Sequence, residues 1–372
     1  MKIKIGVFTG ARSDYGVTKK LIKNLNDDKI FDVKIFVSGM HLLKKYGNTF
    51  NEITDDGFLI YKKINTYQEV AKDKRNEFSE TLNKVFESVK NEKLHAGYIV
   101  GDRIEAYGVA LALHFLNIPV IHYAGGQITK GAVDNIYRYN ISNLAYLHFT
   151  TIKTAYQRLI NLPTLNSENV YFTGSTAIDS IQDFLIKPIN ISTLIPDLHD
   201  DNYVLMTFHP VTNSEEVIED IMEYSINKIL NLKLKILITF PNNDTGADKI
   251  ISVIENFKSD KNVIVKKNLG TVGYYSAINN SKFVIGNSSS GVIEVPYFNK
   301  ISINIGRRQD GRDLDQNVWS IKSDTKELNS LIERGNLINW RTLGNNSLYG
   351  SGNSIQLING ILKKKFQNIL NN

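Results

Sequence analysis

Hydrophobic residues along this chain come in short runs separated by longer stretches with helical spacing. Apolar runs of four to eight residues predict strands, and apolar residues repeating every three or four positions predict helices. In the first half the predicted strands are Ile3–Thr9, Phe31–Ser38, Ala96–Val100 and Ile118–His122, and the predicted helices are Asp14–Asn26, Phe78–Lys90 and Ile104–Leu116. This alternation predicts a parallel sheet with helices on both faces.

The second half repeats the alternation without repeating the sequence. Its predicted strands are Val170–Thr173, Tyr203–Phe208, Lys235–Thr239, Asn262–Lys266, Phe283–Gly286 and Ile301–Ile305, with helix-like stretches at Ser214–Leu230 and Ser354–Ile369. A length of 372 residues suits two domains of roughly 150–200 residues each. We therefore expect two doubly wound, Rossmann-like α/β domains at 1–178 and 179–353, with a cleft between them. A C-terminal helix at 354–372 could pack back on the first domain.

Composition removes several classes of function. No apolar run approaches the ~18 residues of a membrane span, and no secretory signal is evident, so we expect a cytoplasmic protein without a membrane partner. The net charge of +6 comes from dispersed residues, which suits a small anionic substrate and does not indicate nucleic acid. The absence of cysteine and of HExxH-type motifs predicts no disulfide, no catalytic metal and no other cofactor.

The segment Gly286–Glu294 carries the strongest chemical signal. Ser288, Ser289 and Ser290 follow a predicted strand and precede a predicted helix, where free backbone N–H groups and the helix dipole favour an anion. Glu294 should lie in about the first turn of that helix, where it could bind a ribose diol. Phosphate and ribose together indicate a nucleotide, although a serine-rich helix cap without a ligand is the competing interpretation.

Two loops of the first half follow strands in the same way. Arg12 comes after Thr9-Gly10-Ala11 and could hold a phosphate, or it could be a surface arginine in an ordinary turn. Asp102 directly follows a strand and is a candidate acid or base. A role for Asp102 as a helix N-cap is an equally good interpretation from position alone.

Two loops of the second half are also candidates. His209 follows a strand and precedes Pro210, so it could donate to a phosphate or transfer a proton, although a lone histidine often does neither. Three arginines follow the strand Ile301–Ile305 and predict a diphosphate clamp, with a solvated charge run as the alternative. They are Arg307, Arg308 and Arg312.

Together these motifs resemble the hydrolysing sugar-nucleotide 2-epimerases. Those enzymes convert UDP-N-acetylglucosamine, or a diacetamido-trideoxy relative, to a 2-epimeric free sugar and a nucleoside diphosphate for sialic or legionaminic acid synthesis. The resemblance spans most of the chain, through Thr9–Gly16, Val37–Leu42, Gly101–Glu105, His122–Phe149, Phe172–Ser175, His209–Thr212, Pro241–Asp244, Gly286–Glu294 and Gly306–Arg312. It implies a glycosyltransferase-B-like fold, with the nucleotide mainly on the C-terminal domain and the sugar facing the N-terminal one. A homo-oligomer is plausible for the same reason.

The resemblance assigns roles position by position. Asp102, Asp134 and His209 match family residues that we expect to be catalytic, and Arg138 matches an arginine on the sugar side. The resemblance also implies a phosphate- and ribose-binding set made of Arg12, Ser288, Ser289, Ser290, Glu294, Arg307, Arg308 and Arg312.

The sugar side departs from the family pattern. Where the family reads His-Ile-Glu-Gly-Gly-Glu, this chain has Tyr123, Ala124 and Gln127, so both carboxylates are lost. Where the family reads Asp-Asp-x-x-Arg-His, this chain has Asn135 and Tyr139. We place Tyr123, Gln127 and Tyr139 beside Arg138 on the sugar side, where they would suit a sugar of different shape or lower polarity, such as a deoxy sugar.

The first functional hypothesis is a hydrolysing 2-epimerase acting on a nucleotide-diphospho-N-acetyl sugar. Epimerisation at C2 through elimination needs ionisable groups at the ring, and neither Ala124 nor Gln127 supplies one. A non-epimerising sugar-nucleotide hydrolase or glycosyltransferase is therefore the alternative. A nucleotide-binding regulatory subunit without turnover is a third possibility.

Overall fold

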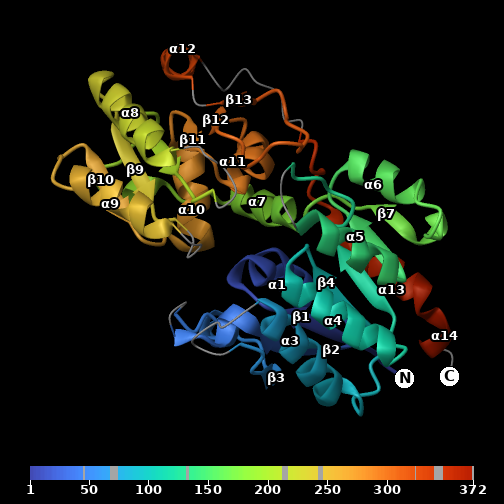
Figure 1. Ribbon diagram of the computed structural model, residues 1–372. Coiled ribbons are helices and arrows are strands. Elements are labelled where there is room, and N and C mark those ends of the chain that lie inside the picture. Colours follow the sequence, from blue (N-terminus) through green and yellow to red (C-terminus); the bar gives the residue numbers. More distant parts are fainter. Residues whose placement is uncertain are drawn as a thin grey trace. The chain divides into compact units, whose positions relative to one another are not determined.

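The computed structural model describes residues 1–44, 47–67, 74–130, 134–211, 217–241, 246–322, 324–338 and 347–370. The chain forms two compact units, shown in Figure 1. The N-terminal unit comprises Met1–Ile128, Ala132–Ser180 and Tyr349–Asn372, and the C-terminal unit comprises Thr129–Gly131 and Ile181–Leu348. Each unit is built around its own parallel sheet.

The sheet of the N-terminal unit has seven strands in the described part of the chain, in the order β3-β2-β1-β4-β5-β6-β7. All neighbouring strands pair in parallel. The strands are β1 (Ile3–Thr9), β2 (Phe31–Ser38), β3 (Ile60–Ile64), β4 (Ala96–Val100), β5 (Val120–Tyr123), β6 (Leu147–Thr150) and β7 (Val170–Phe172).

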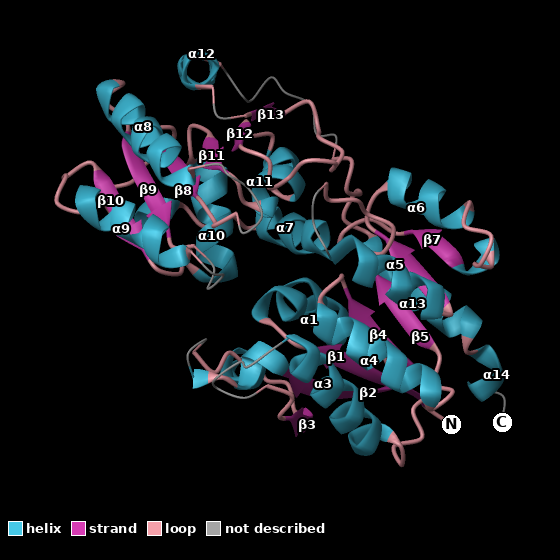
Figure 2. Cartoon of the chain, in the orientation of Figure 1, coloured by secondary structure: helices cyan, strands magenta, loops and turns pink. Residues whose placement is uncertain are grey.

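Helices cover both faces of this sheet (Figure 2). The helical segments of this unit are α1 (Arg12–Asp27), η1 (Gly39–Leu42), α2 (Phe50–Asp55), α3 (Lys74–Val89), α4 (Ile104–Phe115), α5 (Asp134–Leu144), α6 (Lys153–Ile160), η3 (Ser167–Asn169), α13 (Ser354–Lys365) and α14 (Gln367–Leu370). Helix α7 (Thr176–Ile186) begins in this unit and continues into the C-terminal one. One core joins alternate strand residues to α1 and α13, and a second core joins the intervening residues to α3, α4 and α5. Burial on both faces explains why the strands are continuous apolar runs.

The C-terminal helix α13 is fixed to the N-terminal unit by polar contacts as well as by its apolar face. The Asp179 carboxylate accepts hydrogen bonds from the backbone N–H groups of Ser354 (3.2 Å) and Ile355 (3.0 Å). The amide of Asn359 donates to the Asn24 side chain of α1 at 2.7 Å. A buried carboxylate therefore satisfies the free N–H groups at the start of α13.

The C-terminal unit contains a parallel six-stranded sheet in its described residues, in the order β10-β9-β8-β11-β12-β13. Its strands are β8 (Tyr203–Thr207), β9 (Lys235–Thr239), β10 (Val263–Lys266), β11 (Val284–Gly286), β12 (Ser302–Ile305) and β13 (Val318–Ile321). Its helical segments are η4 (Ile191–Thr193), α8 (Ile218–Asn231), α9 (Ala247–Phe257), α10 (Gly270–Asn280), α11 (Ser289–Ile293), η5 (Val295–Phe298) and α12 (Thr325–Leu337).

The two parallel sheets confirm the predicted α/β fold class. Every strand predicted from an apolar run is present within two residues of its predicted bounds. The hydrophobic pattern did not predict β3, β6 and β13, nor the helices α5, α6, α9, α10 and α12. The predicted helix over Ser214–Leu230 begins at Ile218, and residues 214–216 lie outside the described part. None of the described helices is long and apolar enough to cross a membrane.

Candidate active site

An ion pair connects the loop after β4 to helix α5. The Asp102 carboxylate pairs with the Arg138 guanidinium, whose side chain is only 3% exposed, while that of Asp102 is 30% exposed. Arg138 also donates to the Gln127 carbonyl (2.5 Å) and to Asn135 Oδ1 (2.8 Å). Asp102 is not the N-cap of α4, because Arg103 occupies that position. The competing cap interpretation of Asp102 is therefore wrong.

His122 of β5 holds the loop after β4 by a hydrogen bond to its backbone. Its Nε2 lies 2.7 Å from the Gly101 carbonyl and its Nδ1 lies 3.0 Å from Ser142 Oγ. Burial lowers the pKa of His122 to about 4, so the ring is neutral. Because a carbonyl only accepts, Nε2 carries the proton and Nδ1 accepts from the serine. The sequence analysis did not assign this role to His122, although its position at a strand end was a usable signal.

The segment after β5 places Gln127 and Tyr139 near Arg138. Gln127 donates from Nε2 to Thr151 Oγ1 at 2.5 Å, and the Tyr139 hydroxyl lies 3.5 Å from the Gly126 carbonyl. Ala124 adopts a left-handed backbone conformation with φ of 66°. The structure thus brings together three of the four predicted sugar-side residues, Arg138, Gln127 and Tyr139.

Tyr123 differs from the expectation. Its side chain is 2% exposed and belongs to the hydrophobic core of the N-terminal unit. Its hydroxyl accepts from the Thr176 backbone N–H at 2.9 Å and lies 3.1 Å from Thr176 Oγ1. Successive strand residues point to opposite faces, and Tyr123 points into the packed face of β5. We therefore remove Tyr123 from the sugar-side set.

The remaining N-terminal candidates lie at the starts of two helices. Asp134 is the first residue of α5, four positions before Arg138. Arg12 is the first residue of α1 and forms an exposed ion pair with Glu52 of α2, with Nε 3.0 Å from Oε1. An exposed pair of this kind contributes little to stability, so the Arg12 guanidinium can exchange this partner for a ligand.

In the C-terminal unit, Asn287 joins three loops and was missed by the sequence analysis. Its Oδ1 accepts from the His209 backbone N–H (2.7 Å), and its Nδ2 donates to the His209 carbonyl (2.8 Å). Its own carbonyl accepts from Gln309 Nε2 at 2.9 Å and from Arg308 Nη1 at 3.4 Å. Asn287 is fully buried, and this one residue contacts both loops: its side chain holds the histidine loop, and its backbone carbonyl holds the arginine loop. Its position between a strand and the serines was the available signal.

The serine loop is a helix start, as predicted. Ser288 is the N-cap of α11, and its hydroxyl accepts from the Ser290 backbone N–H at 3.3 Å. The helix has only five residues, so Glu294 is its C-cap and not part of its first turn. The Ser290 hydroxyl donates to Glu294 Oε2 at 2.5 Å, and burial raises the pKa of Glu294. Serine and carboxylate therefore form one polar pair beside the loop.

Tyr274 of α10 extends this polar pair. Burial raises the pKa of Tyr274 to about 12, and hydrogen bonding of its oxygen with the hydroxyls of Ser290 and Thr207 opposes this rise. Of the predicted arginines, Arg307 is exposed, whereas Arg308 and Arg312 are partly buried. These side chains follow β12 in the same unit as Asn287. Neutral donors and cations close to a helix start are suited to bind an anion.

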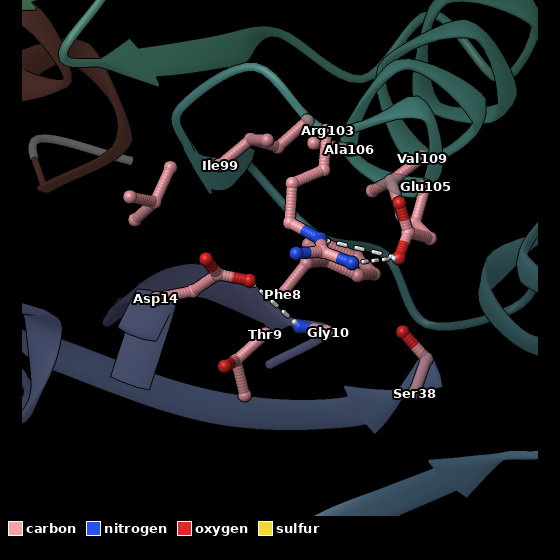
Figure 3. Close-up of a pocket in the computed structure, with 11 residues that line it drawn as sticks. Phe8, Thr9, Gly10, Asp14, Ser38, Ile99, Arg103, Glu105, Ala106 and Val109 are labelled. Carbon is pink, nitrogen blue, oxygen red and sulfur yellow. Dashed lines mark hydrogen bonds and ion pairs between the residues drawn. The ribbon is translucent and has the colours of Figure 1, made fainter. Parts of the chain in front are cut away.

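A cavity of about 20 Å³ lies at the carboxyl ends of β1, β2 and β4, wholly within the N-terminal unit. Figure 3 shows the side chains of Asp14, Arg103 and Glu105 around it. Arg103 donates to Glu105 Oε1 from Nε (3.2 Å) and from Nη2 (3.0 Å). The sequence analysis did not identify this cluster, because its members are separated by about 90 residues in the chain.

The described residues contain no group of three or more histidine, aspartate or glutamate side chains placed to hold a metal ion. The chemistry that they offer is of two kinds. The N-terminal unit presents carboxylates with a buried arginine, which suits proton transfer. The C-terminal unit presents serine hydroxyls, a helix start and arginines, which suit a phosphate.

The chain matches a known family over most of its length. The family model described as UDP-N-acetylglucosamine 2-epimerase matches residues 23–363. A UDP-N,N'-diacetylbacillosamine 2-epimerase (hydrolyzing) of Legionella pneumophila is 32% identical, over 86% of this chain and 85% of its own. A GDP/UDP-N,N'-diacetylbacillosamine 2-epimerase (hydrolyzing) of Campylobacter jejuni is 30% identical, over 90% of this chain and 87% of its own.

Solved structures show the same fold. The UDP-GlcNAc 2-epimerase of Neisseria meningitidis bound to UDP-GlcNAc superimposes with a TM-score of 0.81 at 16% identity, covering 98% of this chain and 100% of that one. The S. aureus MnaA–UDP structure gives a TM-score of 0.82 at 20% identity, covering 99% and 97%. With the family match spanning most of its length, this chain belongs to the UDP-N-acetylglucosamine 2-epimerase family.

Proposed function

We propose that this protein is a hydrolysing 2-epimerase of a nucleotide-diphospho-N-acetyl sugar. The observation that carries the proposal is the family match over residues 23–363, together with relatives of about 30% identity named as hydrolysing 2-epimerases. Both of those relatives are named for diacetylbacillosamine nucleotides. We therefore favour a diacetamido-trideoxy sugar over N-acetylglucosamine, with UDP as the leaving group.

In the proposed reaction the C-terminal unit binds the nucleotide. Ser288, Ser289 and Ser290 donate to the diphosphate from the N-cap and the first turn of α11, and Glu294 accepts from the ribose. His209, held by Asn287, and the arginines Arg307, Arg308 and Arg312 stabilise the negative charge that develops on the leaving diphosphate. We propose that Arg12 of the N-terminal unit also binds phosphate.

The N-terminal unit acts on the sugar. Removal of the C2 proton and loss of the diphosphate from C1 leave a C1–C2 double bond, and water then adds across it. Asp102 and Asp134 are the proposed proton-transfer residues on this route. Arg138, Gln127 and Tyr139 are the proposed contacts to the ring. Arg138 pairs with Asp102 and donates to the Gln127 backbone carbonyl, and the Tyr139 hydroxyl lies by the carbonyl of the neighbouring Gly126.

A second function is favoured by one specific observation. Ala124 supplies no ionisable group, and the amide of Gln127 is engaged with Thr151. A site without those carboxylates could release the nucleoside diphosphate by hydrolysis or transfer and leave C2 unchanged.

The test is a proton and phosphorus NMR time course in deuterated water, with UDP-N-acetylglucosamine and with UDP-N,N'-diacetylbacillosamine. Released UDP together with deuterium at an inverted C2 supports the epimerase. Released UDP with hydrogen retained at an unchanged C2 supports the second function. No release of UDP from either substrate contradicts both.

A further inference from the structure

The carboxyl of Asp14 lines the N-terminal cavity and is held there by hydrogen bonds. Its Oδ2 accepts from the backbone N–H groups of Gly10 (3.3 Å) and Ala11 (3.1 Å), and its Oδ1 accepts from the Ser13 hydroxyl at 3.2 Å. Capping of α1 accounts for the two bonds to Oδ2. It does not account for the partly exposed arginine, Arg103, and the buried carboxylate of Glu105, which line the same cavity.

The arginine in this cavity is already neutralised. Arg103 makes two hydrogen bonds to Glu105, whose side chain is 4% exposed, and its Nη2 lies 3.0 Å from Met40 Sδ. Asp14 and Glu105 therefore share one cation inside a partly apolar pocket whose walls include Phe8, Ile99 and Val109. Under these conditions, two carboxylates and one arginine favour the presence of one proton on the cluster.

The individual effects on Asp14 agree with this picture. Burial raises the pKa of Asp14 to about 6, the Arg103 charge opposes the rise, and the Glu105 charge adds to it. Two polar residues from other segments also lie at this cluster. Ser38 of β2 lines the cavity, and Tyr67 is hydrogen-bonded to Glu105. His41 of η1 lies at the same carboxyl ends of the strands, with its Nε2 2.9 Å from Thr9 Oγ1. Burial lowers the pKa of His41 to about 4, so its ring is neutral. Asp14 is thus the group of this cluster that changes charge close to neutral pH.

We propose that Asp14 is a further proton-transfer residue of this enzyme, acting from the cavity that it shares with Arg103 and Glu105. The inference rests on the proposed epimerase function and adds a residue to it. Arg103 directly follows Asp102 in the loop after β4, so the cavity adjoins the loop that carries a residue already proposed for proton transfer.

The proposed step balances. The ionised Asp14 carboxylate removes the proton from C2, the C–H electron pair forms the C1–C2 double bond, and the C1–O electron pair leaves with the diphosphate. In the return step a second proton-transfer residue, Asp102 or Asp134, gives a proton to the opposite face of C2, and the hydroxyl of a water molecule adds to C1. The remaining proton of that water restores the proton of this residue, and Asp14 releases the proton that it removed to solvent. The sum is substrate plus water giving free sugar plus nucleoside diphosphate.

The deciding variant is Asp14→Asn, because an asparagine oxygen still accepts the two backbone hydrogen bonds but cannot take up a proton. We expect kcat for UDP release to fall by at least about 100-fold with little change in KM, since general base catalysis contributes about 10²–10⁴. Deuterium exchange at C2 should fall in parallel. Asp14→Glu should restore part of the activity, whereas Asp14→Gln, which can make the same capping bond at this position but cannot take up a proton, should not.

Asp324→Asn is the matched control. Asp324 also caps a helix, α12, by accepting from the backbone N–H groups of Lys326 (2.8 Å) and Glu327 (3.2 Å), but it lies in the C-terminal unit outside the cavity. This variant should keep wild-type kcat. Full activity and C2 exchange in Asp14→Asn, while wild type turns over, would overturn the Asp14 proposal and leave the epimerase function standing.

A second measurement does not depend on turnover. Carbon NMR of the aspartate carboxyl groups, assigned by the signal missing in Asp14→Asn, should show Asp14 titrating with a midpoint near pH 6. A midpoint below about 4.5, near the value of an unperturbed aspartate, would overturn the proposal even if Asp14→Asn proves unstable. Absence of UDP release by wild type would instead contradict the proposed function itself, and the Asp14 proposal with it.

Discussion

Asp102 and Arg103 are adjacent in the sequence, yet their side chains form ion pairs with different elements. Asp102 pairs with Arg138 of α5, while Arg103 pairs with Glu105 of α4 and lines the cavity that contains Asp14. The backbone of this loop is held in place at Gly101, because His122 donates a hydrogen bond to the Gly101 carbonyl. One short loop therefore orients two charged groups towards two sets of partners.

The first prediction concerns the Asp102 charge. Asp102→Asn keeps a side-chain oxygen for Arg138 but removes the carboxylate, so we expect kcat for UDP release to fall by about 100-fold or more. The thermal unfolding temperature should change little, since the side chain is partly exposed and Arg138 keeps its bonds to Gln127 and Asn135. Asp32→Asn is the control, because Asp32 lies near the start of β2 and therefore at the amino ends of the parallel strands, away from Asp102. Equal loss of activity in both variants would argue against a specific role for Asp102.

The second prediction concerns Asn287. Asn287→Asp keeps an acceptor for the His209 N–H but places a carboxylate against the His209 carbonyl, where the amide now donates. Leaving buried polar groups unsatisfied costs about 1–3 kcal/mol, and more for a charge. We expect a lower free energy of unfolding by urea denaturation and weaker UDP binding by calorimetry.

Asn202→Asp supplies the comparison for that experiment. Asn202 Oδ1 accepts from the His199 backbone N–H at 3.0 Å, and an aspartate can do the same. Its free energy of unfolding should stay within about 0.5 kcal/mol of wild type. If Asn287→Asp were equally well tolerated and bound UDP normally, the Asn287 side chain would not be what positions the His209 loop.

The sequence located the ends of the strands but not the partners of the residues there. Apolar runs marked β1, β4, β8 and β11 because a sheet buried on both faces needs continuous apolar strands. For the same reason the runs carry no alternation, so they could not show that Tyr123 points into the core. The predicted strand ends therefore identified the candidate loops, but they did not show in which direction each side chain points.

The missing contacts are those between residues far apart in the chain. Arg138 lies 36 residues after Asp102 and Asn287 lies 78 residues after His209. Spacing within one segment cannot predict either pair, because both depend on how the sheet orders its strands. The short helix α11 illustrates another limit. Pro296 follows Glu294 closely, and a new turn, η5, begins at Val295, which ends the helix after five residues.

The third prediction is a loss of stability in mild acid. Burial lowers the pKa of His41 and of His122 to about 4 and that of His148 to about 3, below their ordinary value of 6.5. Between pH 6.5 and 4 the unfolded chain binds protons at these histidines that the folded chain does not. Stability contributed by the neutral rings is therefore fully present above pH 6.5 and is lost as the pH falls.

Protonation of Asp14 affects folding stability in the opposite direction over part of the range from pH 6.5 to 4. Its pKa is raised to about 6, so the folded state binds a proton there that the unfolded state lacks, and its contribution to stability rises as the pH falls. Burial also raises the pKa of Glu294, which acts in the same direction as Asp14. With three histidines against these two carboxyl groups, urea midpoints should decrease from pH 6.5 to 4.5. Replacing His148, whose Nδ1 has no hydrogen-bond partner among the described residues, by a neutral residue should flatten the decrease. A midpoint independent of pH would contradict the burial of neutral rings.

The fourth prediction is a contrast between two glycines. Gly286 ends β11 with φ of 144°, and a Cβ there would lie 1.9 Å from the Thr207 carbonyl oxygen on the neighbouring strand. Backbone must shift to relieve this contact, so Gly286→Ala should destabilise the protein by at least about 3 kcal/mol. Because the strand leads into Asn287 and the serine loop, UDP binding should weaken as well.

Gly360 provides the opposite case within the same protein. It lies on the exposed side of α13, and a Cβ at this position meets nothing within 4 Å. Gly360→Ala should therefore raise the free energy of unfolding by about 0.5–1 kcal/mol, since alanine restricts the unfolded chain and favours the helix. Urea denaturation of both variants measures the contrast directly. If the two substitutions had the same effect, steric contact with the neighbouring strand could not be the reason for glycine at 286, and the geometry of the loop that begins there would need revision.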